Sequence, residues 1–179
     1  MSIVKFDAWD PKATIFVRPR EVTTDLKFVF ADAPYVQTAS SAFTKKDQNI
    51  FLCVDDEAFE QKLNELEELA ATLLHEKSDA WFHKALTRDE IDPMLCSIVR
   101  GRPPKIRLNL RPEGVAVFDD SLNPLDEVPH EATATLIFQV RGISVYKDRF
   151  QVEMLVHQIR LAATTAASPA ELGNEPRFL

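Results

Sequence analysis

The chain of 179 residues is 45% hydrophobic and carries a formal net charge of −7 at pH 7, which predicts one globular domain with a substantial core. The acidic balance, taken alone, argues against a general polyanion binder. No run of 18 apolar residues and no apolar signal-peptide core near the N-terminus is found, so we expect a soluble, intracellular protein without a membrane span.

The first third of the chain has the pattern of short strands. Leu26–Phe30 alternates with a period of two, which places Phe28 and Phe30 on the same face. Tyr35–Asn49 is polar, and we expect a strand end followed by a mobile loop there. Ile50–Val54 is apolar throughout and predicts a short buried strand.

Three helices are expected next. Asp55 or Asp56 is suited to cap the first helix, whose apolar residues then recur at helical spacing. A second, shorter helix is expected to begin at Ser78. Thr87 and Glu90 have the spacing of a capping box, which predicts the start of the third helix.

The stretch Lys105–Leu110 alternates strictly between apolar and polar residues. Ile106, Leu108 and Leu110 would face a core, and the residues between them would face outward. Pro112-Glu113-Gly114 predicts a turn into a returning strand.

Residues 132–161 predict a long, bent β-hairpin. Both arms alternate with a period of two, and Tyr146–Arg149 supplies the turn between them. Gly142 interrupts the first arm, and a lone glycine inside a strand pattern usually marks a bulge or a sharp bend. Long strands with such a bend are what a small closed barrel requires.

The fold class is therefore α+β, mainly β: a small barrel with a helical insertion at about residues 55–97. We expect one domain over residues 1–161. Residues 162–179 are rich in Ala, Thr and Pro, and we expect a disordered tail there.

Catalytic and metal-binding motifs are not found in the sequence. The four glycines are widely separated, so no phosphate-binding glycine loop is present, and we expect no enzyme activity and no cofactor. Cys53 and Cys96 are best interpreted as small buried hydrophobes, and the histidines lack the spacing of metal ligands.

A local basic segment stands out against the acidic whole. Residues 100–111 hold five basic residues and no acid, and side chains at alternate strand positions lie about 7 Å apart. Basic groups with nearby aromatic side chains are the general requirement for binding single-stranded nucleic acid. The alternative is an ordinary solvated strand face. The candidate binding residues are Arg100, Arg102, Lys105, Arg107, Arg111, Tyr146, Lys147, Arg149, Phe150, Lys45, Lys46, Phe43 and Tyr35, with Phe43 and Tyr146 expected to be the most exposed aromatic residues.

A spaced pattern covering about residues 50–161 resembles a known family. Its members are the single-stranded DNA-binding proteins of large nucleocytoplasmic DNA viruses, which are similar to phage replication single-strand binders. The matching positions are Trp81-Phe82, Lys105–Arg111, Phe118-Asp119, Gly142, Lys147, Phe150 and His157-Gln158.

The resemblance implies an OB-fold barrel that binds single-stranded DNA without base specificity in viral replication, recombination or repair. It gives the binding role to Lys105, Arg107, Arg111, Lys147 and Tyr146. Replication proteins as partners, a homo-oligomer, and a viral replication site or the virion as location are consistent with it. The alternative is a structural or assembly protein, associated with the virion, that keeps this fold and lacks the DNA groove.

Overall fold

The computed structural model describes residues 2–163, so most of the expected tail lies outside the described residues. The described part is mainly β, with two α-helices and one short 3-10 helix at Pro11–Ala13. The strands are β1 Ile3–Lys5, β2 Ile15–Phe16, β3 Arg20–Thr23, β4 Leu26–Asp32, β5 Tyr35–Gln37, β6 Ser41–Lys46, β7 Asn49–Cys53, β8 Val99–Arg100, β9 Lys105–Leu110, β10 Ala116–Phe118, β11 Pro124–Leu125, β12 Glu131–Tyr146 and β13 Phe150–Leu161. The helices are α1 Glu57–Phe82 and α2 Arg88–Met94, which confirms a helical insertion between strands.

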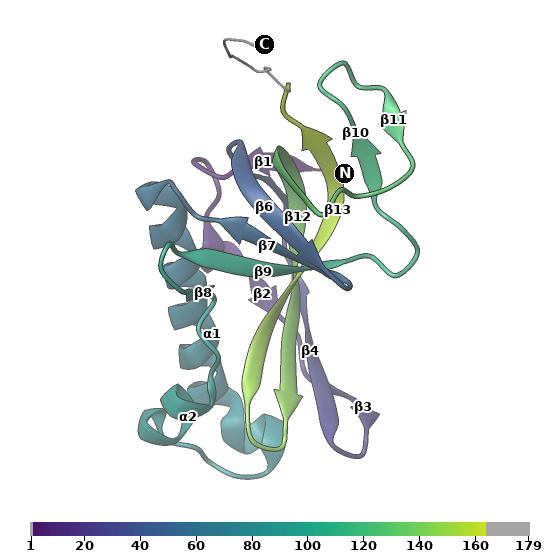
Figure 1. Ribbon diagram of the computed structural model, residues 1–179. Helices are drawn as coiled ribbons and strands as arrows, with labels where there is room; N and C mark the ends of the chain where they lie inside the picture. Colours follow the sequence, from purple (N-terminus) through teal and green to yellow (C-terminus); the bar gives the residue numbers. More distant parts are fainter. Residues whose placement is uncertain (1, 164–179) are drawn as a thin grey trace.

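The strands form one large mixed sheet that curls into a partial ring (Figure 1). Following the pairings from β12 through β6, β7, β9 and β13 leads back to β12. The ring is closed only by a short contact between β9 and β13, because two residue pairs join these parallel strands. The structure therefore has a partial ring within a larger sheet in place of the expected closed barrel.

The long hairpin of β12 and β13 organises the sheet, as the sequence predicted. It extends well beyond the ring, and there β4 and β3 pair beside it (Figure 1). The register shifts between Val140 and Gly142, which confirms the bulge at the glycine. A Cβ at Gly142 would lie 2.0 Å from the Val29 carbonyl oxygen and 2.7 Å from the Phe28 ring, so only glycine fits.

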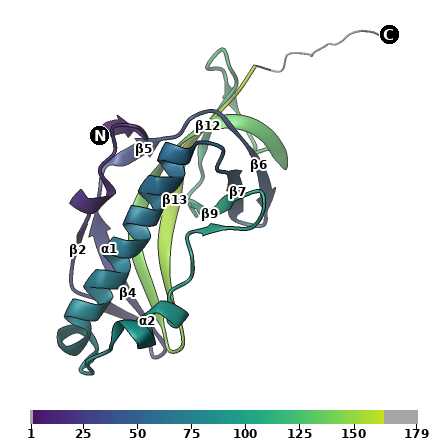
Figure 2. The same cartoon turned by 90° about the vertical axis from the view of Figure 1, so that its left-hand side faces the viewer.

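Helix α1 packs across one face of this sheet (Figure 2). It begins as predicted, because the Asp56 carboxylate accepts a hydrogen bond from the Phe59 amide at 3.1 Å. Its buried residues recur at helical spacing, and the Phe59 ring lies 6.2 Å from that of Phe138 in β12. Trp9 contacts the same ring edge-on at 5.9 Å, so the core lies between α1 and the sheet.

The predicted second helix at Ser78 is wrong, because α1 continues without interruption to Phe82. The Ser78 hydroxyl does not cap a helix. It donates to the His75 carbonyl at 2.9 Å and accepts from the Leu86 amide at 2.8 Å, which ties the following loop to the helix. The third predicted helix is confirmed as α2, with the complete capping box of Thr87 and Glu90.

The expected mobile loop at residues 35–49 is also wrong, because this stretch forms β5, β6 and the beginning of β7. Its polar residues occupy the exposed side of half-buried strands. A buried polar side chain in this stretch forms a hydrogen bond to a neighbouring strand: the Thr38 hydroxyl accepts from the Leu136 amide of β12 at 3.0 Å.

Candidate nucleic-acid interface

The hairpin and β4 have two different faces. Val29, Ile143, Val145 and Val152 are buried on the face that helices α1 and α2 cover. Cross-strand neighbours share a face, so the register places a second set on the opposite side. This second side, called the outer face below, carries Phe28, Phe30, Ser144, Gly142 and Glu153.

Two aromatic rings and two guanidinium groups meet on the outer face. The rings of Phe28 and Phe30 pack edge to face, with centroids 4.8 Å apart. The Arg141 guanidinium lies 5.4 Å from the Phe28 centroid, and that of Arg20 lies 5.7 Å from the Phe30 centroid. Phe30 is 37% exposed, so the outer face presents a partly free aromatic ring beside two cations.

Glu153 joins β9 to this surface. Its carboxylate accepts hydrogen bonds from the Ser144 hydroxyl at 2.7 Å and from the Asn109 amide at 2.9 Å. The Arg107 guanidinium lies 3.6 Å from the same carboxylate, whose side chain is only 14% exposed. Arg107, a predicted site residue, is therefore held at the edge of the outer face by an acid of β13.

A third cluster follows along β13 near the end of β9, where side chains of β13 and β5 meet across β12. The rings of Tyr35 and His157 pack edge to face, with centroids 4.7 Å apart. Burial lowers the pKa of His157, the Arg111 charge lowers it further, and Glu113 opposes both. The Arg111 guanidinium donates to Glu113 at 2.6 Å, and this bond keeps the pKa of the Glu113 carboxyl below its ordinary value.

The structure brings several predicted basic residues together around β8 and β9. Arg100 lies opposite Lys105 in the ladder, and Arg100 and Arg107 line the same small depression beside Gln151. Arg102 is exposed in the turn that joins the two strands.

Other predicted residues lie elsewhere. Tyr146 is half-buried, less exposed than predicted, because the Arg149 guanidinium lies 4.2 Å from its ring centroid, and Lys147 is exposed beside it at the hairpin tip. Five residues of extended strand, about 17 Å, separate this tip from Leu155, which pairs with Asn109 of β9. Lys45 and Lys46 are at the far end of β6, where Lys46 is exposed and Lys45 is half-buried.

Two predicted stacking residues lie in the core. Phe43 is 2% exposed, because β6 turns it into the ring opposite Leu52. Phe150 is also 2% exposed, because its ring stacks on Phe82 of α1 at 6.0 Å. Neither ring has a free face for a base, so the prediction of an exposed Phe43 is wrong and Phe150 is no longer a candidate.

The sequence reasoning missed Arg20, Phe28, Phe30 and Arg141. The available signal was that β4 is apolar on both faces, since Val29 alternates with the two phenylalanines. In such a strand one apolar set is buried, and of the other set Phe30 stays exposed here while Phe28 is also buried.

The described residues contain no group of three or more His, Cys, Asp or Glu side chains arranged to hold a metal ion. Cys53 and Cys96 are free and half-buried, less buried than expected. Neither helix within residues 2–163 combines the length and apolar character needed to cross a membrane.

Comparison with known proteins gives a likeness of fold. No family model and no curated protein matches the sequence. The structure is similar to a C-terminal truncation of the single-stranded DNA-binding protein from bacteriophage Enc34, with a TM-score of 0.52, 8% identity, and coverage of 84% of this chain and 96% of that one. A second structure of the Enc34 protein gives a TM-score of 0.44 at 9% identity, covering 82% of this chain and 89% of that one. The fold thus resembles that of a phage single-strand binder, and membership of the large-virus family named above is not shown.

Proposed function

We propose that the protein binds single-stranded DNA without base specificity and that the strand lies on the outer face. The observation that carries this proposal is the exposed ring of Phe30, which packs on the buried ring of Phe28 and is flanked by the guanidinium groups of Arg20 and Arg141. Aromatic rings stack with any base, and arginines pair with the phosphates between bases, so such a surface binds without reading sequence. The likeness to the fold of the Enc34 protein supports the proposal.

The distribution of charge favours this face over the helical one. By strand alternation and the cavity described below, the outer face carries Arg20, Arg107, Arg111, Arg141 and Arg160 together with Asp32, Glu113, Asp120 and Glu153, so its charges nearly balance. Residues 55–68, which include the first turns of α1, hold seven acids and one lysine. A nucleic acid backbone is therefore repelled from the helix side, which accounts for a binding function in a protein of net charge −7.

The remaining predicted residues extend this surface in the proposal. Arg100, Arg102 and Lys105 continue it along β8 and β9, and Tyr35 adds an aromatic ring beside His157. The hairpin tip and the two lysines of β6 are outlying contacts for a longer strand. In this proposal the partial ring of strands corresponds to an OB-like barrel. The protein would be soluble and intracellular, and it would serve viral replication, recombination or repair.

A structural or assembly role is the second candidate. Ile15, Val17 and Val22 are 61%, 45% and 58% exposed on β2, β3 and the segment between them, next to Phe30. Exposed apolar groups at a sheet edge are typical of protein contacts. Arg107 and Arg111 are also already paired with acids, which reduces the free positive charge of the outer face.

Fluorescence anisotropy separates the two roles. A labelled oligo-dT of about 30 nucleotides, long enough for at least one binding site, is titrated with the full chain at several salt concentrations. The proposal expects tight binding that falls steeply with salt, because phosphate neutralisation releases counterions, and weaker binding to a duplex of equal length. No binding at low salt would exclude the DNA-binding role, and self-association measured by light scattering without DNA would then support assembly.

A further inference from the structure

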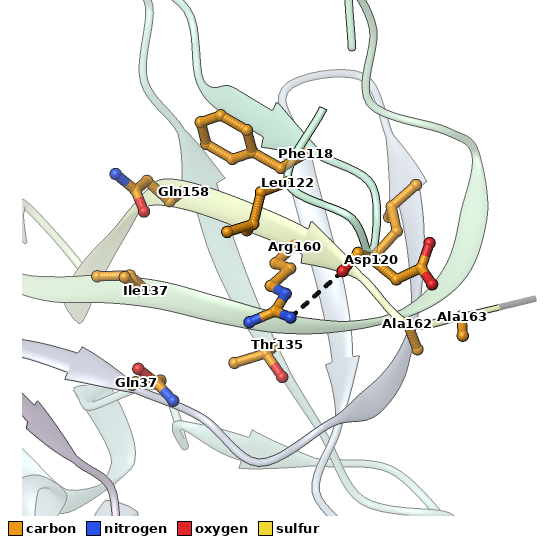
Figure 3. Close-up of a pocket in the computed structure, with 11 residues that line it drawn as sticks. Gln37, Phe118, Asp120, Leu122, Thr135, Ile137, Gln158, Arg160, Ala162 and Ala163 are labelled. Carbon is orange, nitrogen blue, oxygen red and sulfur yellow. Dashed lines mark hydrogen bonds between the residues drawn. The ribbon is translucent and has the colours of Figure 1, made fainter. Parts of the chain in front are cut away.

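A cavity of about 590 Å³ opens on the outer face near the end of β13 (Figure 3). Its floor consists of two neighbouring rows of cross-strand residues. One row is Gln37, Ile137 and Gln158, and the other is Thr135, Arg160 and Phe118. Because Tyr35 and Gln37 alternate with buried Val36 on β5, the cavity continues the surface on which Tyr35 and His157 lie.

The polar groups of the cavity have few partners of their own. The side-chain amides of Gln37 and Gln158 are half-buried, and neither forms a hydrogen bond within residues 2–163. The Arg160 guanidinium donates one hydrogen bond, to the Asp120 backbone carbonyl at 3.3 Å, out of the five that it can donate. Figure 3 shows Arg160 between the apolar pair Phe118 and Leu122 on one side and Thr135 on the other. Side-chain amides that line the cavity without a partner within residues 2–163 can bind a ligand with hydrogen-bonding edges.

An apolar side chain is held at the rim in an unfavourable conformation. Leu122 is 59% exposed and has a φ of +67°, a left-handed conformation that leucine rarely adopts. The turn around it is fixed by the Asp119 carboxylate, which accepts from the amides of Ser121 at 2.9 Å and Asn123 at 2.8 Å. The turn therefore keeps an apolar group at the mouth of the cavity instead of burying it.

We propose that this cavity receives one unstacked base of the bound single strand, an inference that rests on the proposed function. A base has flat apolar faces, which suit Phe118, Ile137 and Leu122, and a polar edge, which suits the two amides. Asp120 adds a carboxylate to the lining that contains Arg160, so the net charge of the lining is close to zero and a nearly neutral base fits better than a free anion. The volume lies in the range of about 300–1,000 Å³ that small-ligand sites occupy.

NMR titration of ¹⁵N-labelled protein tests the inference directly. The probes are the thymidine tetranucleotide dT4 and deoxyribose 5-phosphate, which has the phosphate and sugar without a base. We expect the side-chain amide signals of Gln37 and Gln158 to shift with dT4 and to stay in place with deoxyribose 5-phosphate. Equal shifts with both probes would overturn the inference, because they would indicate a phosphate site.

Two further outcomes separate this inference from the proposed function. If dT4 shifts the signals of Asn109 and Phe30 but leaves those of Gln37 and Gln158 unchanged, the strand lies on the outer face and the cavity is not its base pocket. If dT4 shifts no signal, the proposed function fails, and the inference fails with it.

Substitutions give a second test. Leu122→Ala and Arg160→Ala should each weaken oligo-dT binding by about tenfold, the effect of losing roughly one base contact. Both side chains are exposed, so folding is preserved. Leu125→Ala, on β11 just after this turn and outside the cavity, and Lys77→Ala, on α1, are the matched controls and should bind normally. Normal affinity in Leu122→Ala and Arg160→Ala, with a loss in Arg141→Ala, would overturn the inference.

Discussion

Arg141 lies over the Phe28 ring, with its guanidinium carbon 5.4 Å from the ring centroid. Arg141 is the extra residue of the bulge in β12, so it has no partner opposite it in β13. The next residue, Gly142, leaves the space that the ring occupies. The bulge thus turns a charged side chain onto an aromatic ring at the surface, as bulges beside functional sites often do.

Gly142→Ala should destabilise the protein by about 3 kcal/mol, because the new methyl group would meet the Val29 carbonyl, which cannot move without disrupting the pairing of β4 and β12. Urea denaturation followed by circular dichroism measures the loss. Gly114→Ala is the control: its φ is +106° but no atom lies within 4 Å of the added Cβ, so only backbone strain of about 1–2 kcal/mol is expected. Equal losses in the two variants would contradict the close approach.

Phe30→Ala should weaken binding of oligo-dT by about 1–3 kcal/mol, the typical contribution of one base stacked on an aromatic side chain. Stability should fall by about 1–2 kcal/mol, because the ring is only 37% exposed and packs edge to face on Phe28. Anisotropy titrations measure the affinity. Val22→Ala, which shortens an exposed apolar side chain on the neighbouring β3, should bind normally, and a similar loss in both variants would indicate a general effect of the sheet edge.

Glu153→Gln should strengthen DNA binding and make it more sensitive to salt. The amide can replace the carboxylate toward Ser144 and Asn109, while Arg107 loses its ion pair and becomes free for a phosphate. One added phosphate contact makes the slope of log K against log salt steeper by about 0.7 for a single strand. The folded state should lose about 1 kcal/mol, because charge-assisted hydrogen bonds are replaced by neutral ones.

Glu76→Gln controls for the change in net charge, because Glu76 is exposed on α1 away from the outer face. Its effect should be small, since surface charges beyond about 10 Å are screened at moderate salt. Unchanged slopes in both variants would mean that Arg107 makes no phosphate contact.

The parts of the fold with strong local signals were predictable. The period of two in β9, β12 and β13, the lone Gly142 and the Thr87–Glu90 capping box each have one favourable local structure, and all are confirmed. Where the local sequence is compatible with two structures, tertiary contacts determine which of them forms. Ser78 can cap a helix or bond within one, and the packing of α1 against the sheet selects the second.

The site was harder to predict than the fold, because it combines elements distant in the sequence. The basic strand was visible as a local run, but Arg20, Phe30 and Arg141 meet only through the pairing of β3, β4 and β12. Alternation alone also cannot show which face of β4 is covered, since both are apolar. The same limit explains Phe43: its polar neighbours indicated exposure, whereas its pairing with Leu52 turns it inward.

The stability of the protein should fall as the pH drops below about 6.5, the ordinary pKa of a histidine, because of His157. In the folded state its pKa is lower, since burial and Arg111 disfavour the imidazolium. The unfolded chain therefore binds more protons in this window, and the free energy of unfolding decreases by at most about 1.4 kcal/mol per pH unit. Well above pH 6.5, His157 is neutral in both the folded and the unfolded chain, and its contribution to the free energy of unfolding stays constant.

His157→Phe should remove this dependence of stability on pH between pH 6.5 and about 5. Below pH 5 the carboxylates begin to titrate and add their own dependence. Urea denaturation at a series of pH values measures the effect. Phenylalanine keeps a ring against Tyr35 and eliminates the buried Nε2, which has no hydrogen-bond partner within the described residues. The matched substitution His130→Phe, at an exposed position, should leave the dependence as in the parent chain. If His157→Phe retains the full pH dependence, the group responsible is not this histidine. Bound DNA should raise the lowered pKa of His157 in the folded protein, because a phosphate near Arg111 and His157 favours the imidazolium. Affinity should therefore rise as the pH falls toward that lowered pKa in the parent chain and not in His157→Phe.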